Sequence, residues 1–213
     1  MKNVLVLTFS ILTVAQAAPT YRLNWVQLHP AAWPSPRGGA AMAYDWVSRK
    51  VVLFGGYSGT AYLGDTWTFD GANWTMLSPA VSPPARTAAS MAFDSVNHKL
   101  VMFGGYTKQA GYFGDTWIFD GSTGTWEATT PSLSPPAVTQ PMAFHDPLSG
   151  YVDVYGGFDG KFFQLNTWQW TGADWVQLHP ANSPTARAAA IVAEDHTVKN
   201  RSPVWRAGRR EPI

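Results

Sequence analysis

A segment of about fifty residues is repeated along most of this chain. Each copy contains an apolar run that ends in a glycine pair, then an aromatic segment centred on one tryptophan, and then a second tryptophan. The glycine pairs are Gly55-Gly56, Gly104-Gly105 and Gly156-Gly157. The 19 Gly and 16 Pro residues exclude long helical bundles and favour short strands separated by turns. The repeat therefore predicts stacked, similar units that bury their apolar faces against their neighbours.

The second copy shows how one unit is expected to fold. Its apolar and aromatic runs predict strands at 88–93, 99–103, 115–120 and, more briefly, from residue 125 onward. The second of these strands is apolar on both faces, as expected of a strand that is covered on both sides. In the third strand, Trp117 and Phe119 lie on one face at a period of two. Each unit is therefore predicted to be a four-stranded sheet, and the fold class to be all-β.

Four strands per unit, with a glycine pair after the second and a tryptophan opening the fourth, resemble the Kelch repeat. In the first copy the resemblance rests on residues 51–56 (VVLFGG), 65–70 (DTWTFD) and 73–75 (NWT), and it covers about residues 21–198. The long proline-rich connectors are similar to those of bacterial secreted Kelch proteins of the galactose oxidase-like central-domain type. The resemblance implies a β-propeller in which the repeated residues are structural. They are Gly55, Gly56, Trp67, Trp74, Gly104, Gly105, Trp117, Trp126, Gly156, Gly157, Trp168 and Trp175.

The number of units is low for a propeller, which closes with roughly four to eight blades. The expected organisation is a lone copy of the fourth strand of a unit at about 24–28, complete blades at 37–78, 86–130 and 138–179, a partial blade at 187–198, and a basic, disordered tail at 199–213. Where a fourth glycine pair is due, the chain has Trp205-Arg206. We expect a fragment of a longer propeller. The alternative is a natural half-propeller that forms a homodimer.

Residues 1–17 have the features of a secretory signal peptide. Lys2 precedes an apolar run at 4–14, and Ala15-Gln16-Ala17 forms a small-x-small cleavage site. The apolar run is too short to cross a bilayer, and no later stretch qualifies as a membrane span. Because the chain contains no cysteine, it fits a bacterial envelope protein better than a disulfide-stabilised eukaryotic one. The expected location is therefore secreted or periplasmic.

Arginines stand just before the first strand of several units. They are Arg37, Arg86 and Arg187, and Val138 occupies the corresponding place in the remaining unit. One interpretation is structural: each arginine forms an ion pair with a third-strand aspartate, Asp65 or Asp115, in its own or an adjacent blade. The other follows from the resemblance, since arginines at this position in Kelch adaptor proteins line the open face and bind acidic peptide side chains. The three arginines are therefore candidate ligand-binding residues.

The loops between the second and third strands, at 57–64, 106–114 and 158–166, vary between copies and carry aromatic residues. Tyr57, Tyr106, Tyr112 and Phe158 are candidate ligand-binding residues, with Tyr62 in the same loops. Exposed rings contribute contact area at little entropic cost and suit a glycan or a peptide. The alternative is that they only cover the blade edges.

Signals for catalysis are weak, and we expect no catalytic residue, cofactor or metal. The absence of cysteine excludes galactose oxidase activity, for which the resemblance would imply a cysteine-crosslinked tyrosine. No hydrolase elbow, phosphate loop or zinc-protease motif is present. The acidic body is a poor match for nucleic acid. The predicted function is a non-catalytic secreted binding module for an unknown protein or glycan, and the alternative is a fragment of a propeller-type carbohydrate-active enzyme.

Overall fold

A computed structural model describes residues 27–190, in which all of the regular secondary structure is β. The predicted all-β fold class is thereby confirmed. The expected signal peptide at 1–17, most of the lone strand at 24–28, the end of the partial blade from residue 191, and the tail at 199–213 lie outside the described residues. Between residues 27 and 190 no helix is long and apolar enough to cross a membrane.

Within residues 27–190 the strands form three four-stranded antiparallel sheets, one for each full repeat, which we call blades 1 to 3. Blade 1 contains β1 (Ala41–Asp45), β2 (Lys50–Tyr57), β3 (Tyr62–Phe69) and β4 (Trp74–Leu77). Blade 2 contains β5 (Ser90–Asp94), β6 (Lys99–Phe103), β9 (Thr116–Asp120) and β10 (Thr125–Ala128). Blade 3 contains β11 (Met142–His145), β12 (Val152–Tyr155), β13 (Thr167–Trp170) and β14 (Trp175–Leu178). A two-stranded ribbon, β7 (Tyr106–Thr107) and β8 (Gly111–Tyr112), extends the loop between β6 and β9.

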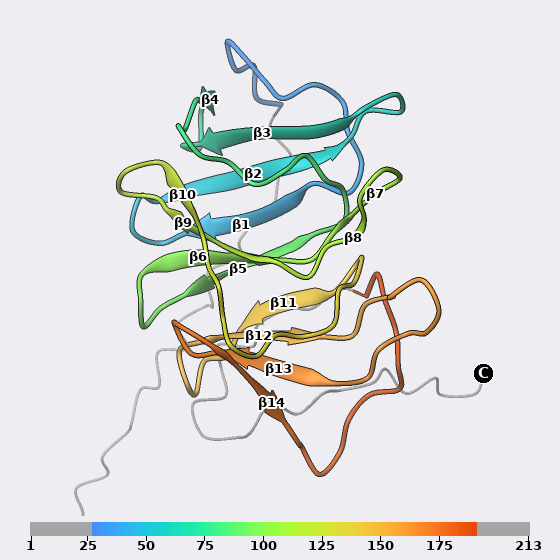
Figure 1. The fold of residues 1–213 in the computed structure, drawn as a ribbon. Coiled ribbons are helices and arrows are strands. Elements are labelled where there is room, and N and C mark those ends of the chain that lie inside the picture. The colour runs from blue at the N-terminus through green and yellow to red at the C-terminus, as the bar shows by residue number, and fades with distance from the viewer. Residues whose placement is uncertain (1–26, 191–213) are drawn as a thin grey trace, which may run out of the picture.

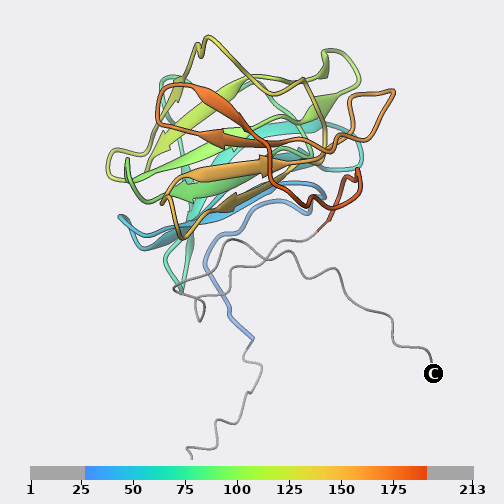
Figure 2. The same ribbon diagram turned by 90° about the horizontal axis from the view of Figure 1, so that it is seen from below.

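The three blades are stacked side by side (Figure 1). Their first strands are neighbours, since β5 packs against both β1 and β11, and each sheet runs outward from its first strand in chain order. Seen along the stack in Figure 2, blade 3 overlies the other two. Blade 2 is therefore covered on both faces, whereas blades 1 and 3 each have one face with no neighbouring blade in the described part of the chain.

Each glycine pair lies where the connector of the next blade docks. Gly55 has a φ of +68°, and a Cβ there would lie 2.6 Å from the backbone oxygen of Arg86. That same oxygen accepts a hydrogen bond of 2.8 Å from the Gly56 amide, and the Arg86 amide donates to Leu63 at 3.1 Å. Side chains at the glycine positions would block this close approach of two backbones. The glycine pairs therefore hold adjacent blades together.

In blades 2 and 3, the tryptophan of the fourth strand joins its blade to the preceding one. The Trp126 indole Nε1 donates to the Thr66 hydroxyl of blade 1 at 2.9 Å, and the Trp126 ring lies 5.3 Å from that of Phe54. One blade further on, Trp175 repeats these contacts with Thr116 at 2.8 Å and with the ring of Phe103 at 5.4 Å. The rings belong to two buried clusters that fill the spaces between blades. The Trp126 and Trp175 side chains are therefore buried between adjacent blades.

Blade 3 departs from the others by carrying a buried carboxyl on its far face. Asp153 stands at the place of Val52 and Val101, is only 3% exposed, and accepts a hydrogen bond of 2.9 Å from the Gln169 amide. The pKa of Asp153 is raised to about 6, chiefly by burial and also by the charge of Asp146, while the Gln169 hydrogen bond and the nearby His145 oppose this rise. The ionised form is therefore disfavoured in the folded protein.

This carboxyl predicts a specific pH dependence of stability. The unfolded pKa is near 3.8, so between about pH 4 and pH 6 the folded state holds a proton that the unfolded chain has lost. The stabilising contribution is complete below about pH 4 and is lost as the pH rises through 6. We expect Asp153→Asn to raise the free energy of unfolding at pH 7 by on the order of 2 kcal/mol, and to have little effect at pH 4. Urea unfolding of both proteins at each pH measures this, and an equal difference at both values would contradict it.

Candidate functional site

Two of the candidate arginines form bidentate ion pairs within their own blades. The Arg37 guanidinium donates to the two Asp65 oxygens at 2.5 and 2.8 Å, and Arg86 donates to those of Asp115 at the same distances. Each guanidinium also donates at 3.1 Å to the carbonyl oxygen of the first glycine of its own blade's pair, Gly55 or Gly104. Arg37 and Arg86 therefore form the ion pairs with third-strand aspartates that the structural interpretation expects. Their role in ligand binding stays a prediction.

In both pairs the carboxylate, and not the guanidinium, reaches the surface. The side chains of Arg37 and Arg86 are 5% and 0% exposed, against 27% for Asp65 and 37% for Asp115. Burial by itself would raise the pKa of both carboxyls. The hydrogen bonds from the arginines and from the indoles two residues further along the chain outweigh it and hold each pKa below its usual value. The sites therefore present partial negative charge.

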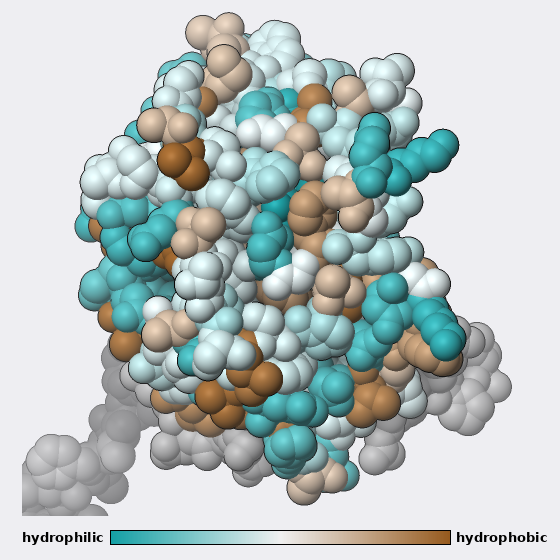
Figure 3. Space-filling model, viewed as in Figure 1, coloured by the Kyte–Doolittle hydropathy of each residue, from teal (hydrophilic) through white to brown (hydrophobic). Residues whose placement is uncertain are grey.

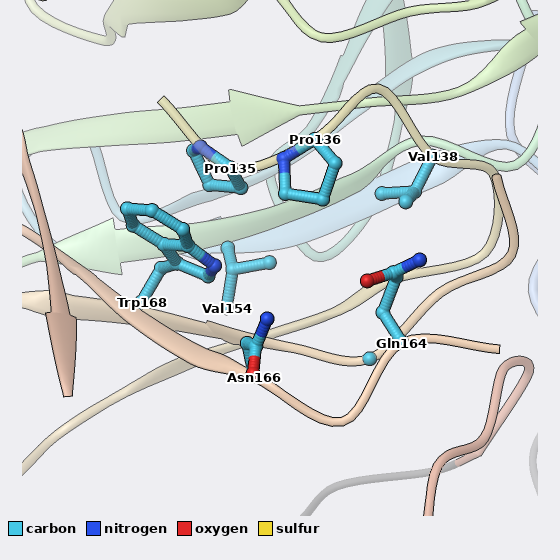
Figure 4. Close-up of a pocket in the computed structure, with 8 residues that line it drawn as sticks. Pro135, Pro136, Val138, Val154, Gln164, Asn166 and Trp168 are labelled. Atoms are coloured by element: carbon cyan, nitrogen blue, oxygen red, sulfur yellow. The ribbon is translucent and has the colours of Figure 1, made fainter. Parts of the chain in front are cut away.

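Blade 3 has lost both members of the pair. Val138 replaces the arginine, and Asn166 occupies the position that corresponds to Asp65 and Asp115. A cavity of about 10 Å³ remains between these side chains, bounded by Pro135, Pro136 and Trp168 (Figure 4). The indole Nε1 of Trp168 is buried and has no hydrogen-bond partner, whereas Trp67 and Trp117 donate to their aspartates at 2.6 and 2.7 Å. The cavity marks the place of the missing ion pair and is large enough for about one water molecule.

The third arginine, Arg187, has the same local geometry but no carboxylate partner among residues 27–190. Its Nε and Nη2 atoms donate to the carbonyl and hydroxyl oxygens of Thr185 at 2.9 and 3.0 Å. Its backbone docks on blade 3, since the Gly157 amide donates to the Arg187 oxygen at 2.9 Å. Arg187 is therefore held in place, with part of its guanidinium available for an anionic group.

The aromatic loop residues come together as one continuous row along the edge where β2–β3, β7–β8 and the β12–β13 loop project (right in Figure 1). The row, which we call the aromatic row, consists of Tyr57, Tyr62, Tyr106, Tyr112, Phe158 and Phe163. Successive ring centroids are 5.0, 6.4, 5.1, 6.1 and 5.1 Å apart. Figure 3 shows two hydrophilic projections over the loops of blades 2 and 3 at this edge, with paler surface between them. The row thus crosses all three blades.

The structure brings all four predicted loop aromatics into this row, together with two residues that are absent from the predicted site, Tyr62 and Phe163. A repeat signal identifies both. One aromatic residue directly follows each glycine pair, and a second follows five or six positions later. The first of each pair is held by an isolated bridge to the connector of its own blade, as in Gly38 with Tyr57 and Thr87 with Tyr106. Tyr57 is 39% exposed and Phe163 is 56% exposed, so both ends of the row are open.

The described residues contain no cluster of three or more histidine, aspartate or glutamate side chains that could hold a metal ion. His145, the last residue of β11, lies 3.0 Å from the hydroxyl of Ser95 in the β5–β6 turn, at the opposite end of the blades from the aromatic row. The row itself carries rings and backbone groups, with carboxylates nearby. Such a surface is suited to binding by contact and hydrogen bonding.

The comparisons with known proteins agree with the fold. A model of the KLHDC2/KLHL20/DRC7 Kelch-repeats domain matches residues 18–198. A comparison with curated proteins found no match. The matched range contains all three blades, both ion pairs and the whole aromatic row. Since this range is most of the 213-residue sequence, the chain belongs to the family of Kelch-repeat domains.

Proposed function

We propose that this chain is a protein-interaction module that binds an extended segment of a partner protein along the aromatic row. The observation that carries the proposal is the continuity of six rings across three blades. Rings of this kind supply large contact area and lose little conformational freedom on binding. The blades hold the row rigidly, because each of its loops follows a glycine pair that is locked to the next connector.

The charge beside the row favours a basic partner segment. Asp65 and Asp115 lie at the same ends of their blades as the row, and their carboxylates are partly exposed while their arginines face inward. A lysine or arginine in the partner would find carboxylate oxygens there. An acidic segment held by Arg37, Arg86 and Arg187 is the other candidate, and it is supported at Arg187, which has no carboxylate partner in the described residues.

We also propose that the protein works outside the cytoplasm, in a bacterial envelope or beyond it, and that it has no catalytic role. The support for export is the charged start, apolar run and Ala-Gln-Ala sequence within residues 1–17. Sequencing the amino terminus of the exported protein tests this proposal, with Ala18 as the expected first residue. An extracellular glycan is the alternative ligand, since aromatic rings also pack against sugar faces.

A peptide-display library tests the binding proposal. We expect the purified chain to enrich peptides that combine aromatic or aliphatic residues with lysine or arginine. Fluorescence anisotropy with a labelled enriched peptide should then show that Tyr106→Ala raises Kd at least about tenfold, as for a central aromatic contact. Tyr151→Ala is the matched control, because Tyr151 is a half-buried tyrosine in the β11–β12 turn at the other end of blade 3, and it should leave Kd unchanged.

Three results would count against the proposal. The first is that the library yields no enriched peptide. The second is that enriched peptides bind the Tyr106→Ala variant as tightly as the parent protein. The third is that acidic peptides are enriched and that their binding depends on Arg187. The last would assign the ligand to the arginines. If the chain binds glycans on an array and no peptides, and this binding also depends on Tyr106, the aromatic row is the binding surface but its ligand is a glycan.

A further inference from the structure

A groove of about 840 Å³ runs along the first strands of the three blades, β1, β5 and β11. Most of its lining is apolar. Met91 and Phe93 of β5 line it and are only 6% and 8% exposed, and Met42 of β1 lines its open side and is 58% exposed. The volume lies within the range of pockets that hold small molecules, about 300–1,000 Å³. The groove can therefore cover much of an apolar ligand.

Aromatic side chains extend the groove toward the β1–β2 turn, at the end of the blades opposite to the aromatic row. Tyr44 and Trp46 are 39% and 64% exposed, and their rings meet edge to face with centroids 4.8 Å apart. Both residues line the groove, and Phe144 of β11 lines it on the side of blade 3. A sugar in this groove would place hydroxyl groups against apolar side chains, which is unfavourable without hydrogen-bond partners. An aliphatic chain makes no such demand and suits this lining better.

The charged groups of the β1–β2 and β5–β6 turns favour an anionic ligand. Among residues 27–190, no aspartate or glutamate lines the groove. The carboxylates of Asp45 and Asp94 are buried and accept hydrogen bonds from the amides of their own turns. His98, in contrast, is exposed and lines the groove, and Arg49 is exposed at the corresponding position of the β1–β2 turn. In these turns, therefore, hydrogen-bond donors face solvent and the carboxylates do not.

We propose that the groove binds an aliphatic carboxylate, that is, a fatty acid. The aliphatic chain lies along β1, β5 and β11, against Met42 and Trp46, and the carboxylate accepts a hydrogen bond from the His98 imidazole at the β5–β6 turn. This site lies at the opposite end of the blades from the aromatic row and does not rest on the proposed peptide binding. It gives the protein a second ligand of a different chemical class.

Isothermal titration calorimetry with decanoate tests this proposal, and two related ligands test its parts. Octanoate should bind about fifteenfold more weakly than decanoate, since each buried methylene contributes about fourfold in affinity. Decyltrimethylammonium carries a similar chain with a cationic headgroup, and it should bind at least about tenfold more weakly than decanoate. All three ligands are used below the concentrations at which they form micelles. The proposal is overturned if decanoate does not bind, if octanoate binds equally well, or if the cationic ligand does.

Trp46→Ala tests the location of the site. Trp46 and Trp33 are both 64% exposed, but Trp33 lies in the connector before β1 and does not line the groove. Trp46→Ala should raise the Kd for decanoate at least about fivefold because it removes apolar contact area, and Trp33→Ala should leave the Kd unchanged. Equal effects of the two variants would place decanoate elsewhere and overturn the proposal. Thermal melting verifies that both variants are folded.

His98→Asn tests the contact with the headgroup. His98 has a φ of +57°, a conformation that asparagine also adopts, so the variant should fold normally. We expect it to raise the Kd for decanoate about three- to tenfold and to leave the Kd for decanol, which has no charge, unchanged. If the variant weakens both ligands equally, or neither of them, His98 does not bind the carboxylate and the proposal is overturned.

Discussion

Asp115→Asn is expected to lower the free energy of unfolding by about 2–3 kcal/mol, because the buried Arg86 guanidinium loses a charge-assisted partner that is itself partly exposed. The Arg86 side chain is 0% exposed, so its guanidinium would be left in the interior without a counter-charge. The opposite change, Arg86→Met, should cost less. Asp115 is 37% exposed and can be hydrated by water once the arginine is gone. Urea unfolding at pH 7 of both single variants measures this asymmetry.

The double variant Arg86→Met with Asp115→Asn makes the prediction sharper. It removes both charges together, as blade 3 does with Val138 and Asn166. We expect it to be more stable than Asp115→Asn alone, since no buried charge is left unpaired. Additive costs of the two single changes would show that Arg86 and Asp115 are not coupled. Installing the pair in blade 3 by Val138→Arg with Asn166→Asp should likewise be tolerated better than Val138→Arg alone.

Trp175→Ala is expected to lower the free energy of unfolding by about 3–5 kcal/mol, as for other large core deletions. The ring is 1% exposed and lies 5.4 Å from Trp170 in its own blade and 5.4 Å from Phe103 in blade 2. Its removal would open a cavity between the two blades. Trp33→Ala is the control, because Trp33 is 64% exposed and should change stability by less than about 1 kcal/mol.

Thr116→Val distinguishes the hydrogen bond of Trp175 from its packing. The Thr116 hydroxyl accepts from the Trp175 indole at 2.8 Å, so the valine variant leaves a buried N–H without a partner. The expected cost is about 1–3 kcal/mol. Chemical denaturation with tryptophan fluorescence follows both variants. If Trp175→Ala costs no more than Trp33→Ala, the assignment of Trp175 to the contact between blades is wrong.

Much of the fold could be predicted from local patterns. Alternating aromatic residues such as Trp117 and Phe119 indicated strands, and the glycine pairs and tryptophans indicated a Kelch repeat, because these patterns repeat at a constant spacing. The sequence did not show which charged side chains pair with one another inside the protein. The sequence offered two roles for Arg86, and only its 2.5 Å contact with Asp115 and its complete burial show where its charge is directed. Whether a charged side chain points into the protein or into solvent depends on which side of its loop faces water. The spacing of residues along the sequence does not contain that information.

The aromatic row illustrates the same division. The aromatic residues after each glycine pair, such as Tyr57 and Tyr106, could be identified one by one from the sequence. Whether they form one continuous surface depends on the rotation between adjacent blades. That rotation is set by contacts between segments about fifty residues apart, such as the Arg86 backbone against Gly56 and Trp126 against Thr66. The sequence by itself determined the repeated strand order, the aromatic and glycine positions and the family, since these follow from periodicity. Tertiary structure decided which side chains meet across blades, because those meetings arise from packing between units.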